Sequence, residues 1–282
     1  MKKGLVLEGG AMRGMFTAGV IDVMMENNIE FDGLIGVSAG AAFGCIYKSG
    51  QNGRTLRYNM KYCRDKRYCS LWSLIFTGNL YGAEFCYHEL PEKLDVFDSD
   101  AFERNPMEFY IVCTDVITGK PVYKKCEKSD YNCMEWMRAS ASMPLVSQIV
   151  EVDGYKMLDG GVSDSIPLKY FEDIGYDRNI VILTQPADYI KGPNKLMPLI
   201  KLALKKYPNM VKAMRDRAEM YNKTVREICE KEKRGEVFVI RPESKLPVGR
   251  IEKNPEVLKA TYDLGRAAAI KHLDAIKKYL SV

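Results

Sequence analysis

Histidine is scarce in this sequence, because the 282 residues include only His88 and His272. Few side chains are therefore available as the base of a conventional serine, histidine and aspartate triad. The eight cysteines contain no C-x-x-C pair, so neither a zinc site nor a small disulfide framework is indicated. We expect reduced thiols, no bound metal and no cofactor.

Long apolar runs are also missing. Residues 179–184 are among the longest such stretches, and a membrane span requires roughly 18 to 20 residues. The run at residues 4–7 is too short for the core of a signal peptide. With 46% apolar residues, the chain can bury a full core. We expect one domain over residues 1–282, located in the cytoplasm, with peripheral contact as its route to a membrane.

Positive charge is concentrated in one segment. Residues 195–234 hold 12 Lys or Arg and 5 Asp or Glu, a local +7 against a net charge of +5 for the whole chain. The remainder therefore carries −2. A solvated helix face is the more frequent explanation of such a segment, and transient contact with an anionic membrane surface is the alternative.

Apolar periodicity predicts strands that alternate with helices, which is typical of a mainly parallel sheet covered on both faces. The predicted strands lie at 4–8, 34–37, 109–114, 155–158, 180–183 and 237–240. The predicted helices lie at 15–26, 39–47, 133–140, 196–232 and 255–280, so residues 195–282 form a mainly helical carboxyl-terminal part.

Residues 51–106 interrupt this alternation. Basic and aromatic residues are interleaved there, as in Arg54, Tyr58, Arg64, Tyr68 and Trp72. No recognised nucleic-acid-binding module accompanies them, so we expect no nucleic-acid partner. We interpret the segment as an inserted helical cap near the functional site.

Gly36-Val37-Ser38-Ala39-Gly40 matches G-x-S-x-G between a predicted strand and a predicted helix. In a nucleophile elbow the serine occupies a sharp turn, and small flanking residues let two backbone segments cross. The pattern by itself is weak, but its position makes Ser38 the candidate nucleophile.

A glycine-rich loop, Gly9-Gly10-Ala11-Met12-Arg13-Gly14, follows the first predicted strand. Such a loop supplies backbone N–H groups for an oxyanion. A nucleotide-binding loop of the form G-x-G-x-x-G is the alternative, but it requires glycine where this chain has Ala11.

The serine also needs a base. His88 lies in the inserted segment, and His272 falls away from the apolar face of its predicted helix. Asp159 follows a predicted strand and precedes Gly160 and Gly161, although Asp-Gly-Gly is also an ordinary turn sequence. A carboxylate can act as this base if burial and contact with the serine adjust its pKa.

These blocks together resemble the patatin-like phospholipase family, with its D-G-G-G-x-R-G loop, G-x-S-x-G elbow and later D-G-G. Residues 138–144, R-A-S-A-S-M-P, resemble a fourth family block before the aspartate. This chain departs from the pattern at Glu8, the usual aspartate, and at Ala11, the usual third glycine. Both departures keep the catalytic groups and suggest a divergent, bacterial-type branch.

The resemblance implies a three-layer α/β/α fold and a lipid acyl hydrolase that needs neither calcium nor histidine. It makes Ser38 the nucleophile and Asp159 the base of a dyad that forms an acyl-enzyme. The expected substrate is a lipid or another ester. It assigns the oxyanion hole to Gly9, Gly10 and Ala11, and the supporting loop positions to Arg13, Gly14, Gly36, Gly40, Gly160 and Gly161.

Two other hypotheses remain open. One is a conventional α/β-hydrolase esterase that uses His272, which follows Asp159 in the chain as that fold requires. The other is a non-catalytic lipid- or nucleotide-binding module that retains the loops.

Overall fold

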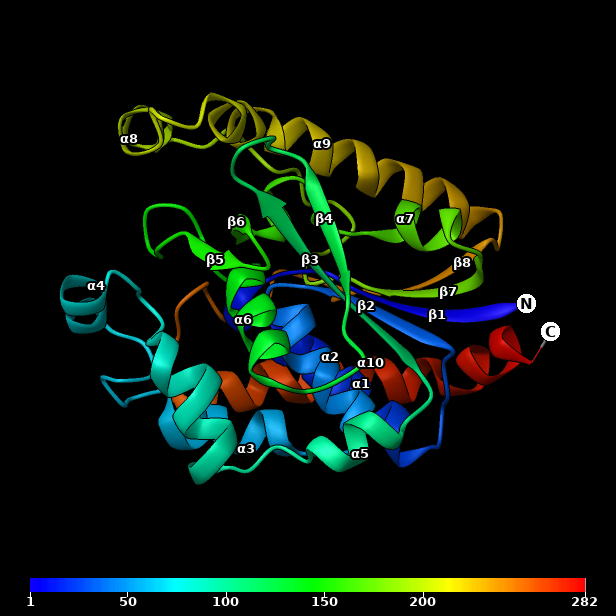
Figure 1. The fold of residues 1–282 in the computed structure, drawn as a ribbon. Coiled ribbons are helices and arrows are strands. Elements are labelled where there is room, and N and C mark those ends of the chain that lie inside the picture. The colour runs from blue at the N-terminus through cyan, green and yellow to red at the C-terminus, as the bar shows by residue number, and fades with distance from the viewer. Residues whose placement is uncertain (282) are drawn as a thin grey trace.

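The computed structural model describes residues 1–281, in which eight strands form one sheet between two layers of helices (Figure 1). The strands are β1 (Lys2–Leu7), β2 (Gly33–Val37), β3 (Glu108–Asp115), β4 (Pro121–Lys125), β5 (Val150–Val152), β6 (Tyr155–Asp159), β7 (Tyr176–Ile182) and β8 (Val237–Ile240).

The centre of the sheet is parallel, in the order β3, β2, β1, β7 and β8. Strands β4 and β6 both pair with β3 in the antiparallel sense, and β5 pairs with β6. The prediction of a mainly parallel sheet is confirmed. The antiparallel edge of β4 and β5 was not predicted from the sequence.

Helices cover both faces of the sheet. On one face lie α1 (Gly14–Glu26), α2 (Ala39–Ser49), α6 (Tyr131–Ser140) and α10 (Pro255–Leu280), and on the other α7 (Leu168–Asp173) and α9 (Pro208–Lys233). Alternate residues of β1 enter the two cores: Leu5 and Leu7 pack in one, and Val6 packs in the other with Tyr221 of α9. The three-layer α/β/α fold is therefore confirmed.

Three loops begin at one edge of this sheet. Strand β1 pairs in register with both neighbours, so that Leu7 lies opposite Gly36 of β2 and Ile182 of β7. The residues that follow these strands, including Ser38, consequently meet at the carboxyl edge of the sheet. Ligand sites of open α/β sheets lie at this edge.

Helices α1 and α10 cross at backbone distance. A Cβ atom on Gly19 would lie 2.0 Å from the carbonyl oxygen of Tyr262, and one on Gly265 would lie 2.0 Å from that of Phe16. The Tyr262 hydroxyl also donates a hydrogen bond of 2.6 Å to Asp22. The two helices thus form one close-packed pair beneath the sheet.

The segment between α2 and β3 contains short helices. They are α3 (Arg54–Tyr62), α4 (Leu71–Thr77), the π-helical segment η2 (Phe85–Leu94) and α5 (Ser99–Arg104).

The helix predicted over residues 196–232 is divided in the structure. Helix α8 (Met197–Ala203) ends before a short connection, and α9 begins at Pro208. Tyr207 has φ −128° and ψ 70°, a conformation outside the helical region, which is disfavoured before proline. Within residues 1–281, no helix is both long enough and apolar enough to cross a membrane.

Candidate active site

Ser38 occupies a strained turn between β2 and α2. Its φ of 55° and ψ of −122° place it in a region that residues with a Cβ atom rarely adopt. Its backbone N–H donates a hydrogen bond of 2.8 Å to Ser140 Oγ, and that hydroxyl donates one of 2.6 Å to the carbonyl of Val112. Ser140 therefore links the turn to strand β3, a role that no spacing in the sequence indicated.

Gly40 allows the chain to cross directly behind Ser38. A Cβ atom at this position would lie 2.6 Å from the carbonyl oxygen of Leu7 and 2.9 Å from that of Glu8. Both neighbours are backbone atoms and cannot rotate away. Gly36, on the preceding strand, would similarly meet the amide of Ala41 at 2.5 Å.

The glycine-rich loop lies beside Ser38. A Cβ atom on Gly9 would lie 3.2 Å from the Ser38 Cβ. Ala11 takes a left-handed φ of 49° and begins the short helix η1 (Ala11–Arg13). The Arg13 Nε donates a hydrogen bond of 3.3 Å to the carbonyl of Gly10, so this side chain braces its own loop. Gly14 begins α1, and a Cβ atom at this position would lie 2.7 Å from the ring of Phe43 in α2.

Asp159 ends β6 and is 2% exposed. Its Oδ1 accepts a hydrogen bond of 2.7 Å from the amide of Gly161, within the buried turn η3 (Gly160–Val162). Burial raises the pKa of Asp159, whereas Arg217, the Gly161 amide and the Ser38 side chain lower it. The structure thus brings Asp159 next to Ser38 in a site where the carboxyl group is harder to ionise than in water.

The two histidines lie elsewhere. His88 Nε2 is 3.2 Å from Glu135 Oε1, and its ring stacks on Tyr131. His272 is half-buried on α10, with its ring centroid 6.0 Å from that of Phe238. Neither is among the described residues that line the cavity containing Ser38. Residues 1–281 contain no group of three or more His, Cys, Asp or Glu side chains placed to hold a metal ion.

A cavity of about 380 Å³ opens at Ser38, a volume within the ~300 to 1,000 Å³ usual for ligand sites. Ala11 and Met12 of the glycine-rich loop lie in its wall. Most of its other walls are apolar or aromatic, and residues 51–106 contribute many of them, including Tyr58, Leu80, Tyr87, Leu90 and Phe97.

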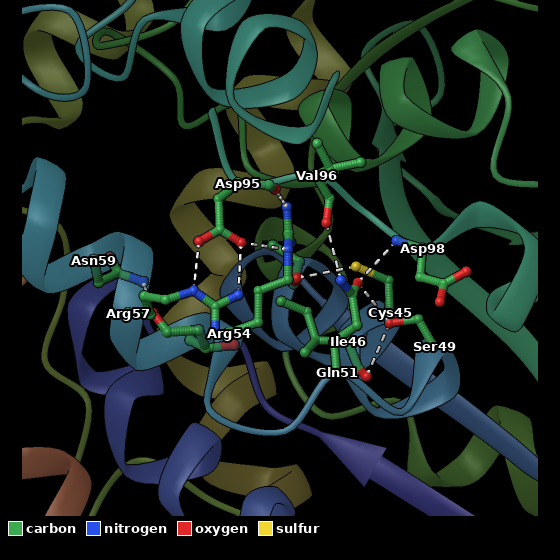
Figure 2. Close-up of polar contacts among 12 residues, drawn as sticks. Cys45, Ile46, Ser49, Gln51, Arg54, Arg57, Asn59, Asp95, Val96 and Asp98 are labelled. Carbon is green, nitrogen blue, oxygen red and sulfur yellow. Dashed lines mark hydrogen bonds and ion pairs between the residues drawn. The ribbon is translucent and has the colours of Figure 1, made fainter. Parts of the chain in front are cut away.

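One polar cluster joins the start of this segment to its residues 95–98 (Figure 2). The Arg57 guanidinium donates two hydrogen bonds to the Asp95 carboxylate, at 2.7 and 2.9 Å, and the buried Arg54 Nε lies 3.1 Å from the same carboxylate. Gln51 donates to the carbonyl of Val96 at 2.9 Å and accepts from the amide of Asp98 at 3.0 Å. Arg54 also lines the cavity, and its contact with Asp95 holds it there.

Helix α9 reaches both loops of the site with side chains that no motif in the sequence indicated. Arg217 Nε donates a hydrogen bond of 2.5 Å to the carbonyl of Gly161, in the turn after Asp159. The Tyr221 hydroxyl donates one of 2.8 Å to Glu8 Oε1, and the Thr184 amide donates one of 2.5 Å to Glu8 Oε2. Glu8 itself is 1% exposed. The glutamate at this loop position therefore extends its carboxylate to the Tyr221 hydroxyl of α9.

Lys191 adds a further cation near the site. Its Nζ lies 3.9 Å from the centre of the Tyr221 ring, and Asn222 exchanges two hydrogen bonds with its backbone, at 2.8 and 2.9 Å. Burial and the neighbouring charges of Arg217, Arg13 and Arg250 lower the pKa of Lys191 to about 7. Its charge in turn lowers the pKa of Asp159.

Residues 5–172 match the family model described as patatin-like phospholipase, which confirms the resemblance drawn from the motifs. Residues 207–281, which include the whole of α9 and α10, match the model of a domain of unknown function, DUF6363. The two matches together divide the chain between the part that carries Ser38 and Asp159 and the part that carries Arg217 and Tyr221.

Relatives with this sequence pattern occur in bacteria and fungi. The chain is 28% identical to the uncharacterized protein YjjU of Escherichia coli K12, over 67% of this chain and 54% of YjjU. It is 27% identical to the uncharacterized NTE family protein Rv1063c of Mycobacterium tuberculosis H37Rv, over 63% of this chain and 48% of that protein. It is 30% identical to lysophospholipase nte1 of Aspergillus terreus, over 62% of this chain and 11% of that protein.

The chain therefore matches about half the length of the two bacterial relatives. Among solved structures, VipD from Legionella pneumophila superimposes with a TM-score of 0.47 and 11% identity, over 97% of this chain and 67% of VipD.

Proposed function

Because the chain belongs to the patatin-like phospholipase family, we propose that it is a lipid acyl hydrolase in which Ser38 is the nucleophile and Asp159 the general base. The observation that carries the proposal is the pairing of a strained serine with a buried carboxylate at the mouth of an apolar cavity. One relative is named a lysophospholipase, which agrees with a lipid ester as substrate.

In the proposed mechanism, Asp159 accepts the proton of the Ser38 hydroxyl as Oγ attacks the ester carbonyl carbon. The backbone N–H groups of Gly9, Gly10 and Ala11 stabilise the resulting oxyanion. The intermediate collapses to an acyl-enzyme, and the proton on Asp159 passes to the departing alcohol oxygen. Water, deprotonated by the same carboxylate, then attacks the acyl carbon and releases the fatty acid and the Ser38 hydroxyl.

A carboxylate can serve as the base because of where it lies. In water an aspartate is a poor proton acceptor at neutral pH, with a pKa near 3.9. Burial of Asp159 raises its pKa, and therefore its affinity for the serine proton. Arg217 opposes this effect and favours the ionised form of the carboxylate.

The cavity is proposed to receive the acyl chain, and residues 51–106 are proposed to act as its cap. The tyrosine, leucine and phenylalanine side chains of this segment give the chain an apolar surface to pack against. The proposed partners are a lipid or another ester and, through the basic segment 195–234, an anionic membrane surface.

The test is ester hydrolysis by Ser38→Ala and Asp159→Asn, assayed with lysophospholipid and with p-nitrophenyl esters of increasing chain length. We expect each substitution to lower kcat/KM by about 10³-fold or more, because the two residues act as a unit. The matched controls are Ser147→Ala, a second serine of the cavity wall, and Asp164→Asn, a second carboxyl group close to the same turn. Both controls should retain activity.

Two outcomes would favour one of the other two hypotheses over the Ser38 and Asp159 dyad. Collapse of activity in His272→Gln would favour a conventional triad. Failure of a fluorophosphonate probe to label Ser38, together with absence of hydrolysis, would favour a binding module.

A further inference from the structure

Helix α4 exposes large apolar side chains to solvent. The exposed fractions are 72% for Leu71, 51% for Trp72, 76% for Ile75 and 69% for Phe76. These residues are spaced by one and four positions, so they form one stripe along the helix, and the rings of Trp72 and Phe76 lie 5.0 Å apart. No charged residue occurs between Arg67 and Glu84. A stripe of this kind is unusual on a surface that faces only water.

Helix α8 also exposes apolar side chains to solvent. Ile200 and Leu204 anchor it, because both are buried in a core cluster with residues of α9. On its outer side Leu199 is 55% exposed and Leu202 is 70% exposed. The loop before the helix adds Ile190, which is 78% exposed.

Residues at or next to both helices line the cavity at Ser38. Leu80 and Tyr81, which follow α4, line this cavity, as do Leu196 and Ile200 at α8. In Figure 1 the two helices lie on the side of the molecule away from the chain termini. The exposed apolar residues therefore lie on segments that continue into the wall of this cavity.

The charges near α8 have one sign. Residues 189–215 contain six lysines and one arginine and no acidic residue. Lys195, Lys201, Lys205 and Lys206 are exposed beside the apolar residues of the helix. Apolar side chains set among lysines are typical of a helix that lies in the plane of an anionic lipid surface.

We propose that α4 and α8 dock on an anionic lipid bilayer, with their exposed apolar residues in the headgroup region and the lysines near α8 on lipid phosphates. The cavity then opens onto the membrane, so that a lipid reaches Ser38 without crossing water; this consequence rests on the proposed function. A second copy of the chain fits the surface less well, because a symmetric contact through α8 would bring the lysines of both copies together.

Tryptophan fluorescence tests the docking directly. The chain has two tryptophans, and Trp136 is 1% exposed, so a change on lipid binding reports Trp72 of α4. The protein is used as Ser38→Ala, which leaves the lipid intact, and is titrated with vesicles of phosphatidylcholine alone or mixed equally with phosphatidylglycerol. We expect a blue shift and co-sedimentation with the mixed vesicles, both weakened by 0.5 M salt. Trp72→Phe should abolish the shift.

Paired substitutions locate the surface. Ile75→Ser with Phe76→Ser, and Leu199→Ser with Leu202→Ser, should each weaken partition into mixed vesicles by about tenfold or more. The control pair, Leu264→Ser with Ile270→Ser, alters exposed apolar residues of α10 and should change nothing. In the wild-type background, hydrolysis of soluble p-nitrophenyl butyrate should be unchanged by all three pairs. Failure of the docking is thus distinguished from failure of the proposed function.

Three results would overturn the proposal. The first is absence of co-sedimentation with mixed vesicles. The second is binding that ignores lipid charge or that the control pair weakens as much as the α4 and α8 pairs. The third is a lipid-free, concentration-dependent dimer that itself shifts the Trp72 emission, which would identify a second copy as the occupant.

Discussion

The part of the chain matched by the phospholipase family model and the part that follows it contribute to the site in different ways. In the first part, backbone segments cross at contact distance, as where Gly40 passes Leu7 and Glu8. In the second part, long side chains of α9 extend to those segments, as Arg217 does to Gly161 and Tyr221 to Glu8. The first part presents the proposed reacting groups, and the second holds the loops that carry them.

The difference shows which of the contacts that stabilise a site can be recognised from a sequence. A backbone crossing tolerates only glycine, so it appears as a motif with fixed spacing. A side chain that spans several ångströms can start from many positions on a helix. Its contribution is visible only after the chain has folded.

Among these predictions, substitution at the backbone crossing of Gly40 should have the largest effect, on the stability of the protein. Gly40→Ala places a methyl group against two immovable carbonyls, so we expect the free energy of unfolding to fall by about 3 kcal/mol. Gly50→Ala is the control, because Gly50 has a φ of 68° and nothing within 4 Å, so that only backbone strain of about 1 kcal/mol is expected. Urea denaturation measures both. Equal losses would mean that the crossing is not what makes the first part rigid.

Arg217 should affect catalysis through the pKa of Asp159, the proposed general base. Because Arg217 lowers the pKa of Asp159, Arg217→Gln should raise that pKa and move the acid limb of the kcat/KM profile to higher pH. We expect a loss of about tenfold at pH values on that limb. Arg215→Gln, two positions earlier on the same helix, is the control, since its side chain is 63% exposed. An unshifted profile in Arg217→Gln would leave α9 a purely structural role.

Tyr221 should contribute to the stability of the protein through its hydrogen bond to Glu8. Tyr221→Phe removes one donor from a buried carboxylate, for which we expect a cost of about 1 to 2 kcal/mol in the free energy of unfolding. The side chain of Tyr131 is 68% exposed, so Tyr131→Phe should be neutral. If the two variants unfold at the same urea concentration, α9 does not stabilise the glycine-rich loop through this contact.

Substitution of Lys191 should have the smallest effect, on the pH dependence of kcat/KM. Its charge lowers the pKa of Asp159, so Lys191→Met should move the acid limb in the same direction as Arg217→Gln but by less. With its own pKa near 7, Lys191 loses its charge as the pH rises through neutrality, and the difference from wild type should fade there. The exposed Lys195→Met serves as control. If Lys191→Met moved the acid limb further than Arg217→Gln does, Lys191 and not Arg217 would have the larger influence on the pKa of Asp159.

The sequence predicted the central architecture well because periodicity reports burial. Strand β8 and helix α10 begin and end at the predicted residues, and the parallel centre of the sheet follows from their alternation. The break between α8 and α9 was missed because apolar residues continue on both sides of it, although Pro208 marks the start of α9.

The sequence also nominates Ser38 and Asp159, whose loops require glycine. It places Ser140 in a family block without indicating that it contacts the turn at Ser38. It does not nominate Arg217 or Tyr221, because their partners depend on tertiary packing between distant elements. Residues 8 and 221, for example, are 213 positions apart and meet only when α9 covers its face of the sheet.

The close crossing of α1 and α10 also bears on how the protein is made. Asp22 and Tyr262 are hydrogen-bonded but 240 positions apart, so a ribosome must add those 240 residues after Asp22 before α1 meets its partner. Until then the apolar face of α1 that receives α10 stays open. Fragments released before α10 should therefore expose this face, and aggregation or chaperone capture is the expected fate of such nascent chains.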